Sequence, residues 1–396
     1  HYRQTLMTRR RVAVTGLGVI ASCGSGVDAF WDGLCGPAPE GERRIKDFDP
    51  TPYFANPKEI RRSDRSTQLA LATAQMALEQ AGDLTAEAAR KGVIVATGIG
   101  GIATLEAQIQ VLLEKGERRV SPFLVPMMMA NAAAAAVSMR HGFCGPAENV
   151  CTACAAGTHA IANAARLIAG GRCDVVLAGG TEAAFTPTAV AGFTNMTAIS
   201  SSGISRPFDA ERDGFMMGEG AGMLVLEDWE TAQERGATIL AEILGGASTA
   251  DAHHITAPSP GGVGAISCMQ LALEEAGLTA DQIGHVNAHG TSTPLNDMAE
   301  AAAMTQVFGD GNPLITSTKG ITGHTLGAAG AIEAVAVVLA MQKALIPPTA
   351  GYATPDPDMA AINLVTGAPV SWEPAPAMSN SFGFGGHNGS LVIGPA

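Results

Sequence analysis

The chain has 396 residues, of which 46% are hydrophobic and only 15% are charged. This composition supplies a large buried core and excludes an intrinsically disordered protein. The formal charge of −13 argues against sequence-independent binding to nucleic acid or to an anionic membrane, so no nucleic-acid partner is expected.

The N-terminus and the cysteines bear on where the protein works. Residues 1–6 precede Met7, and we interpret them as a non-native remnant or an upstream extension. Seven cysteines without regular spacing, and no recognisable signal peptide, favour a reducing compartment over a disulfide framework. The expected location is therefore cytoplasmic.

Short β-branched runs alternate with alanine-rich helical patterns along the chain. Strands are predicted at 11–16 and 92–98, with a helix over 66–82 between them. The strands are apolar on both faces, which is typical of sheets covered by helices on both sides. A similar unit follows, with strands at 173–180, 218–228 and 285–290 and a helix over 268–277. The fold class is therefore α/β.

Glycines after the first strand resemble a dinucleotide-binding motif. Gly16 and Gly18 have the spacing of the glycines that lie beneath a pyrophosphate. In that motif an acidic residue follows about 20 positions later at the end of a second strand, and this chain has a loop there. We do not expect a nucleotide cofactor.

A local basic cluster interrupts the acidic background. Its members, at near-helical spacing, are Lys58, Arg61, Arg62 and Arg65. A solvated helix face is the plain interpretation, and a docking site for an acidic partner is the alternative.

Residues 120–139 carry no charge over a length close to that of a membrane span. Pro122 and Pro126 break the first half and Asn131 lies in the middle. We predict a buried helix at a core or subunit interface, and no membrane insertion.

Cys151 and Cys154 are separated by two residues and precede a helical pattern. A structural zinc site needs four ligands, and no second pair occurs at a suitable spacing, so no metal is expected. A redox pair is chemically possible. Small residues after Cys154 allow a helix to begin there, and its partial positive charge favours a thiolate, so Cys154 is a candidate nucleophile.

Two histidines lie in glycine-rich turns. His289 follows a predicted strand and is followed by Thr291 and Thr293, and Lys319 precedes His324 by five residues. Such turns suit a catalytic site, although a lone histidine is usually structural.

A third glycine-rich segment, 380–389, carries Phe382, Phe384 and His387. It is either a gate or a tight connection between strands. Residues 152–171 and 319–341 share a polar turn, a small-residue helix start and an apolar run, which suggests two related halves.

Four of these segments together resemble one family. TACAAG (152–157), NAHGTSTP (287–294), KGITGHTLGAAG (319–330) and NSFGFGG (380–386) are similar, in order and separation, to the elongating type II β-ketoacyl-ACP synthases of the thiolase superfamily. The resemblance runs from about Val12 to the C-terminus. It implies a thiolase fold, with halves 7–245 and 246–396 stacked in a five-layer αβαβα arrangement.

The resemblance also implies a mechanism. Cys154 would take an acyl group, with the backbone N–H groups of Cys154 and Phe384 as the oxyanion hole. His289 and His324 would hold the malonyl thioester while it loses carbon dioxide. Lys319 would orient the surroundings of His324 and pair with Glu300.

Further roles follow from the same resemblance. Glu333 and Asp297 would be supporting charges. Thr291, Thr293 and Thr256 would bind the pantetheine arm, with Asp251 in the loop near the entrance. Phe384 and Phe382 would form the gate.

The partners implied are an acyl carrier protein, docked on the basic cluster, and a second subunit. The only cofactor chemistry expected is the phosphopantetheine of the carrier. Segment 120–139 would form part of the acyl pocket and the dimer interface, with Met127, Met128 and Met129 as an adaptable wall.

Two positions depart from the family pattern. Asn296 replaces a common glycine before Asp297, and His387 replaces a common threonine. Asn-Asp also occurs in type II polyketide ketosynthases, so a heterodimer with a chain-length factor is the alternative to a homodimer. A thiolase is disfavoured because no cysteine follows Cys268, and a non-catalytic subunit because Cys154 and both histidines are present.

Overall fold

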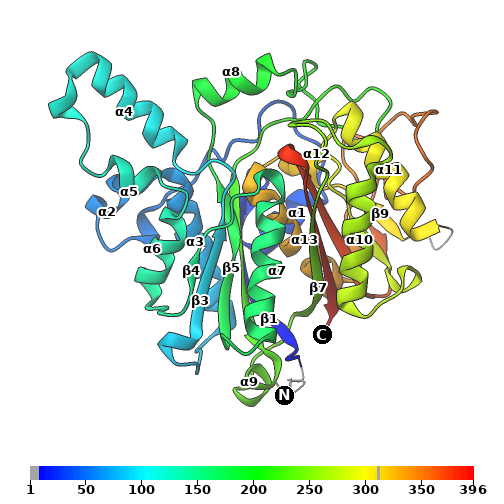
Figure 1. Ribbon diagram of the computed structural model, residues 1–396, viewed down its shortest axis with the longest axis horizontal. Coiled ribbons are helices and arrows are strands. Elements are labelled where there is room, and N and C mark those ends of the chain that lie inside the picture. Colours follow the sequence, from blue (N-terminus) through cyan, green and yellow to red (C-terminus); the bar gives the residue numbers. More distant parts are fainter. Residues whose placement is uncertain (1–8, 310–312) are drawn as a thin grey trace, which may run out of the picture.

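The computed structural model describes residues 9–309 and 313–396 (Figure 1). The predicted remnant or extension at 1–6 lies outside the described residues. The strands are β1 (Val12–Ala21), β2 (Gly24–Ser25), β3 (Lys91–Ala96), β4 (Ala147–Glu148), β5 (Val175–Glu182), β6 (Gly220–Asp228), β7 (Ala241–Ala250), β8 (His285–Asn287), β9 (Leu314–Thr316), β10 (Leu345–Ile346), β11 (Val370–Ser371), β12 (Ala377–Gly383) and β13 (His387–Pro395).

Apart from the helix predicted in segment 120–139, each predicted helix and strand has a counterpart among the observed elements, with bounds that differ by a few residues. The helices are α1 (Val27–Leu34), α2 (Pro57–Arg61), α3 (Arg65–Ala81), α4 (Ile102–Lys115), α5 (Leu124–Met128), α6 (Ala132–His141), α7 (Ala156–Ala169), α8 (Pro187–Asn195), α9 (Trp229–Glu234), α10 (Val263–Ala276), α11 (Pro294–Phe308), α12 (Lys319–Thr322) and α13 (Ala329–Lys343).

The main sheet repeats its own topology. Its strand order is β4-β3-β5-β6-β1-β7-β13-β12-β8-β9, with β2 added to β1. Counted from either end, two parallel pairings are followed by two antiparallel ones. The two groups join where Val12–Val14 pairs with Ala241–Ile243. This repeat confirms the predicted pseudo-symmetric halves.

The second group begins with β7 at Ala241. The predicted boundary between residues 245 and 246 therefore falls inside this strand. The division of the chain into 7–245 and 246–396 stays a prediction.

Helices separate and cover the two groups of strands (Figure 1). Helix α3 packs on β1 and β6, and α6 packs on β3 and α3. On the opposite side, α10 packs on β7 and β13, and α11 packs on α10. Helices α7 and α13 contact strands of both groups and lie between them. The result is the predicted five-layer order of helices, sheet, helices, sheet and helices.

Glycines allow these layers to approach closely. A Cβ on Gly16 would run into the backbone of Ala77, and one on Gly18 into the backbone of Thr73, both on α3. Close packing of a helix on β1 therefore accounts for the glycines that resemble a dinucleotide motif. In the central layer, a Cβ on Gly157 of α7 would lie 2.7 Å from the backbone nitrogen of Ala331 of α13. The first turns of these two helices thus touch.

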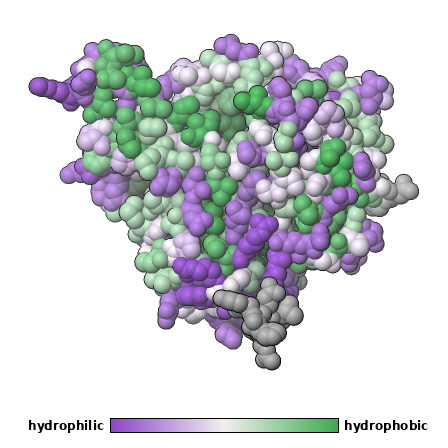
Figure 2. Space-filling view, viewed as in Figure 1, coloured by the Kyte–Doolittle hydropathy of each residue, from purple (hydrophilic) through white to green (hydrophobic). Residues whose placement is uncertain are grey.

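Segment 120–139 is not the single buried helix that we predicted. Helix α5 ends at Met128, Met129 is extended (φ −59°, ψ 141°), and α6 begins at Ala132. The exposed fraction is 58% for Val125 and 78% for Met139. Figure 2 shows hydrophobic side chains gathered near α4, where Leu113 is 81% exposed. The break falls at Met129–Asn131, after the short helix that contains Pro126, and within the segment only Ala133, Ala134 and Val137 are buried.

Among the described residues, one stretch is long and apolar enough to cross a membrane, namely Leu326–Lys343. It contains α13, and 89% of it is buried inside the protein. Its apolar character is accounted for by its place in the central layer.

The packing of α13 on β6 can be tested with one methyl group. A Cβ on Gly222 would lie 2.8 Å from the backbone nitrogen of Ile332. We expect Gly222→Ala to lower the free energy of unfolding by about 1–3 kcal/mol, measured by urea titration. Gly192→Ala in α8 meets open space and should be neutral or stabilising by up to about 1 kcal/mol. A Gly222→Ala protein as stable as the wild type would contradict this packing.

Candidate active site

A cavity of about 330 Å³ brings most of the predicted site residues together. Its lining includes Cys154, His289, His324, Glu300, Thr291, Thr293, Thr256, Asp251, Asn296, Phe382 and Phe384. Met127, Met128 and Met129 are not among the residues that line it. The cavity lies at the N-terminal ends of α7 and α13. The first turns of these helices touch there, which brings the segments before both helices to the same place.

Cys154 lies in a short 3-10 turn, Ala153–Ala155, directly before α7. The preceding Ala153 has φ 50°, in the left-handed region that residues other than glycine rarely adopt. Such strain is typical of turns that hold a reactive group in place. The turn presents the sulfur to the cavity, although Cys154 as a whole is only 5% exposed.

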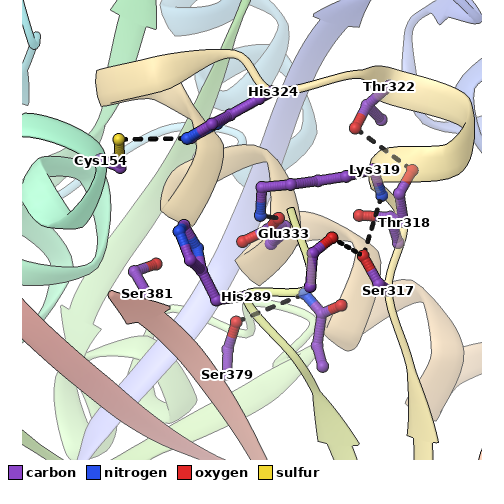
Figure 3. A network of polar contacts seen from close by, with 12 residues as sticks. Cys154, His289, Ser317, Thr318, Lys319, Thr322, His324, Glu333, Ser379 and Ser381 are labelled. Carbon is purple, nitrogen blue, oxygen red and sulfur yellow. Dashed lines mark hydrogen bonds and ion pairs between the residues drawn. The ribbon is translucent and has the colours of Figure 1, made fainter. Parts of the chain in front are cut away.

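His324 contacts this sulfur directly. Its Nε2 lies 3.1 Å from Cys154 Sγ (Figure 3). Its Nδ1 accepts a hydrogen bond of 3.3 Å from the backbone N–H of Leu326. Because a neutral imidazole has one donor and one acceptor nitrogen, this fixes the proton on Nε2. His324 therefore points an N–H donor at the place where a substrate on Cys154 would sit.

His289 completes the pair of histidines. It follows β8, and the backbone N–H groups of His289 and Gly290 donate to Glu300, both at 2.7 Å. The His289 and His324 rings lie edge to face, 5.4 Å apart between centroids. Figure 3 shows both imidazoles directed to the region beside Cys154. Two imidazoles thus border one small volume.

Burial sets the protonation of these groups. Desolvation lowers the pKa of His289 and of His324 well below the ordinary value, and the positive charge of Lys319 lowers both further. Both imidazoles are therefore neutral at physiological pH.

Our expectation that the helix N-terminus favours a Cys154 thiolate needs correction. Burial raises the pKa of the Cys154 thiol to about 11, because removal of solvent penalises the charged sulfur more than the nearby positive groups favour it. The resting nucleophile is therefore a thiol.

The expected ion pair between Lys319 and Glu300 is also wrong. Lys319 Nζ instead contacts Glu333 Oε1, and both side chains are almost fully buried (Figure 3). The α12 turn directs Lys319 to α13, while the carboxylate of Glu300 is already occupied by the two amides of the His289 turn. Burial raises the pKa of Glu333 to about 7 and that of Glu300 to about 8.

Asp297 supports the segment that follows His289. Its Oδ2 accepts hydrogen bonds from the backbone N–H groups of Phe208 at 2.8 Å and Ser292 at 3.1 Å. The Asn296 amide donates to Asp297 Oδ1 at 3.1 Å. Asn296, the departure from the family pattern, is thus part of this buried network.

The segment 380–389 is the tight connection between β12 and β13, with a short 3-10 turn at Phe384–Gly386. The backbone N–H groups of Phe384 and Cys154 both favour the charged form of the Cys154 sulfur and lower its pKa. Their position fits the predicted oxyanion hole. The Phe382 ring lies 6.1 Å from the His289 ring, and the gating roles of Phe382 and Phe384 stay predictions.

The residues assigned to the pantetheine arm lie along the same cavity. Thr291 Oγ1 and Thr293 Oγ1 are 2.8 Å apart. Asp251 accepts from Asn388 Nδ2 at 2.8 Å, which ties the loop near Thr256 to the strand after the Phe384 turn. His387 begins that strand, paired with Gly383 and Ala250.

The basic cluster is not a single helix face. Lys58, Arg61 and Arg62 are exposed on and just after α2, and Arg62 lies 4.4 Å from the centre of the Phe123 ring. Arg65 instead forms two hydrogen bonds of 2.9 Å with Glu219. Its charge is therefore neutralised within the protein.

Sequence reasoning missed Glu182. This residue ends β5, is fully buried, and its carboxylate accepts the backbone N–H of Gly327 near His324. A glutamate after an apolar strand gives little indication of such a contact. In the described part of the chain no group of three or more His, Cys, Asp or Glu side chains could hold a metal ion.

The thiol form of Cys154 predicts a pH dependence. Below the pKa the thiolate fraction rises about tenfold per pH unit. We expect alkylation of Cys154 by iodoacetamide, followed by peptide mass spectrometry, to accelerate in this way from about pH 7 to about pH 9 without levelling. A plateau below about pH 8 would show that the helix terminus and the amides outweigh burial.

Models of two protein domains match the chain. The N-terminal domain of β-ketoacyl synthases matches residues 36–232, and the C-terminal domain of the same family matches residues 240–353. The 3-oxoacyl-[acyl-carrier-protein] synthase 2 of Synechocystis sp. is 43% identical, and 98% of each chain is covered. The synthase of the same name from Vibrio cholerae is 41% identical, over 98% of this chain and 99% of the relative.

Solved structures of ketosynthases have the same fold. A β-ketoacyl synthase from Burkholderia phymatum is 34% identical with a TM-score of 0.90, covering 98% of this chain and all of that chain. The ishigamide ketosynthase/chain length factor is 32% identical with a TM-score of 0.91 over the same shares. With the Cys154, His289 and His324 arrangement described above, these matches show that the chain belongs to the β-ketoacyl synthase family.

Proposed function

We propose that this chain is an elongating 3-oxoacyl-ACP synthase, which condenses an acyl group on Cys154 with a malonyl thioester carried by an acyl carrier protein. The observation that carries the proposal is the 3.1 Å contact between His324 Nε2 and Cys154 Sγ inside the cavity. The nucleophile, Cys154, and the N–H donor, His324, are thereby held close enough to act on the same substrate group.

The first step is acyl transfer. The Cys154 sulfur attacks the carbonyl of the incoming thioester, a new S–C bond forms, and the bond to the pantetheine sulfur breaks. The proton of the Cys154 thiol ends on the released pantetheine thiol. The backbone N–H groups of Cys154 and Phe384 would hold the oxyanion of the tetrahedral intermediate.

The second step is decarboxylation. As the malonyl thioester loses carbon dioxide, the electron pair of the broken bond is delocalised onto the thioester oxygen. Neutral His289 and His324 would donate to that oxygen, and one such donor in a dry site is worth about 3 kcal/mol. The carbanion then attacks the acyl carbonyl and expels the Cys154 sulfur as a thiolate, which takes up a proton from solvent.

The carrier and the second subunit belong to the same proposal. Lys58, Arg61 and Arg62 offer exposed positive charge to an acidic carrier protein. The exposed apolar side chains near α4 and α5, including Leu113 and Val125, suit burial against a second copy of the chain. A cytoplasmic location is proposed because the seven cysteines, all within the described residues, are free.

A ketosynthase subunit of a type II polyketide synthase is the second candidate. Solved relatives include a ketosynthase in complex with its chain length factor, 28% identical with a TM-score of 0.86. The identity to the 3-oxoacyl-ACP synthases is higher, at 41–43%. The two candidates differ in whether the purified chain acts alone.

Intact mass spectrometry tests the proposal. The wild-type protein, incubated with acyl carrier thioesters of different chain length, should gain one acyl mass that disappears when malonyl carrier protein is added. Cys154→Ala should gain no acyl mass. Cys151→Ala is the matched control and should behave as the wild type.

Failure to form the adduct would have two distinguishable meanings. An adduct that appears only when a chain-length-factor homologue is added would favour the polyketide candidate. No adduct under either condition would contradict the assignment of Cys154.

A further inference from the structure

Glu182 is a buried carboxylate that the mechanism above does not use. It is the last residue of β5 and has no exposed surface. Its Oε1 accepts from Thr97 Oγ1 at 2.9 Å and from the backbone N–H of Ile99 at 3.3 Å. Its Oε2 accepts from the backbone N–H groups of Gly98 at 2.7 Å and Gly327 at 2.9 Å. In each of these contacts the partner donates a hydrogen bond to a carboxylate oxygen of Glu182.

These donors belong to two segments, one beside Cys151 and one beside His324. Gly98 follows β3, and its carbonyl oxygen accepts from the Cys151 thiol at 3.4 Å. Gly327 lies three residues after His324, in the short turn that leads into α13. The carboxylate therefore joins the end of β5 to one segment beside the cysteines and to another beside the histidine.

The packing leaves these segments little freedom. A Cβ on Gly98 would lie 2.7 Å from Glu182 Oε2 and 3.3 Å from the backbone nitrogen of Gly327. Leu326, between His324 and Gly327, has φ 51° in the left-handed region, and its N–H donates to His324 Nδ1. The backbone that fixes the His324 tautomer is thus attached directly to the amide that Glu182 holds.

Glu300 is a useful comparison. It accepts the backbone N–H groups of His289 and Gly290, as Glu182 accepts that of Gly327. Each histidine turn is therefore held by one buried carboxylate from a different element. Without Glu182 the Gly327 N–H would lose the carboxylate that accepts its hydrogen bond.

We propose that Glu182 is a positioning residue, which sets the place of His324 relative to Cys154 through the Gly327 amide. The inference rests on the proposed function. A glutamine carries one acceptor oxygen in place of two, so it cannot accept at once from Gly98 and Gly327 and from Ile99, and its NH₂ group would face the Ile99 N–H. The Gly327 turn would then shift, and the His324 imidazole would move away from its position beside Cys154.

The test compares Glu182→Gln with the wild type in two assays. Release of carbon dioxide from malonyl carrier protein needs His324, whereas alkylation of Cys154 by iodoacetamide depends only on access to the sulfur and on its thiolate fraction. For Glu182→Gln we expect kcat for decarboxylation to fall about tenfold to 100-fold, because small displacements of a catalytic group have effects of this size. KM and the alkylation rate should stay within about threefold.

Glu227→Gln is the matched control. Glu227 is also fully buried on a strand, β6, and like Glu182 it does not line the cavity, but it pairs with Arg235 and contacts neither turn of the site. It should lower thermal stability without changing the ratio of the two rates. If Glu182→Gln does not fold, Thr97→Val removes one donor to the same carboxylate and should lower decarboxylation about threefold with alkylation unchanged.

The inference is overturned if folded Glu182→Gln decarboxylates within about threefold of the wild type, or if both rates fall together, as a purely structural role requires. The same holds if Glu182→Gln does not fold and Thr97→Val leaves decarboxylation unchanged. A wild-type protein that releases no carbon dioxide would contradict the proposed function instead, and would do so before any variant is compared.

Discussion

The close packing of α7 against α13 is the constraint on which the site depends. These helices lie between the two groups of strands; α7 begins directly after the turn that carries Cys154, and α13 begins after the turn Leu326–Ala328 that follows His324. Gly157 leaves no space for a side chain where the first turns touch. Because the helix starts touch, Cys154 and His324, which are 170 residues apart in the chain, come within 3.1 Å. The repeated topology thus produces one site from two halves.

The second constraint is that the side chains at this meeting point are buried. Backbone amides in the turns still need acceptors, and buried carboxylates of Glu300, Asp297 and Glu182 provide them. The same lack of solvent keeps the imidazoles neutral and the Cys154 thiol protonated. A neutral N–H donor in such a place stabilises developing negative charge without the cost of reorganising water. Burial therefore explains both the stability of the turns and their suitability for decarboxylation.

Motifs in the sequence predicted the α/β class and the repeat, and the family resemblance that these motifs carry predicted the grouping of Cys154, His289 and His324. These succeeded because glycine-rich turns and helix starts are local features. The partner of Lys319 could not be predicted, since Glu300 and Glu333 lie on different helices and only the direction of the α12 turn decides between them. The pairing of Arg65 with Glu219 and the contacts of Glu182 were missed as well, because they too are decided by how separate segments pack together. Each depends on contacts between segments more than 80 residues apart.

The central claim is that His289 and His324 donate to the same thioester oxygen during decarboxylation. The direct measurement is the initial rate of carbon dioxide release from malonyl carrier protein by His289→Ala, by His324→Ala and by the double variant. Each single variant should lose about 100-fold to 1000-fold in rate. The double variant should lose much less than the product of the two, because both donors act on one charge. A single variant with the wild-type rate, or losses that multiply fully, would contradict the claim.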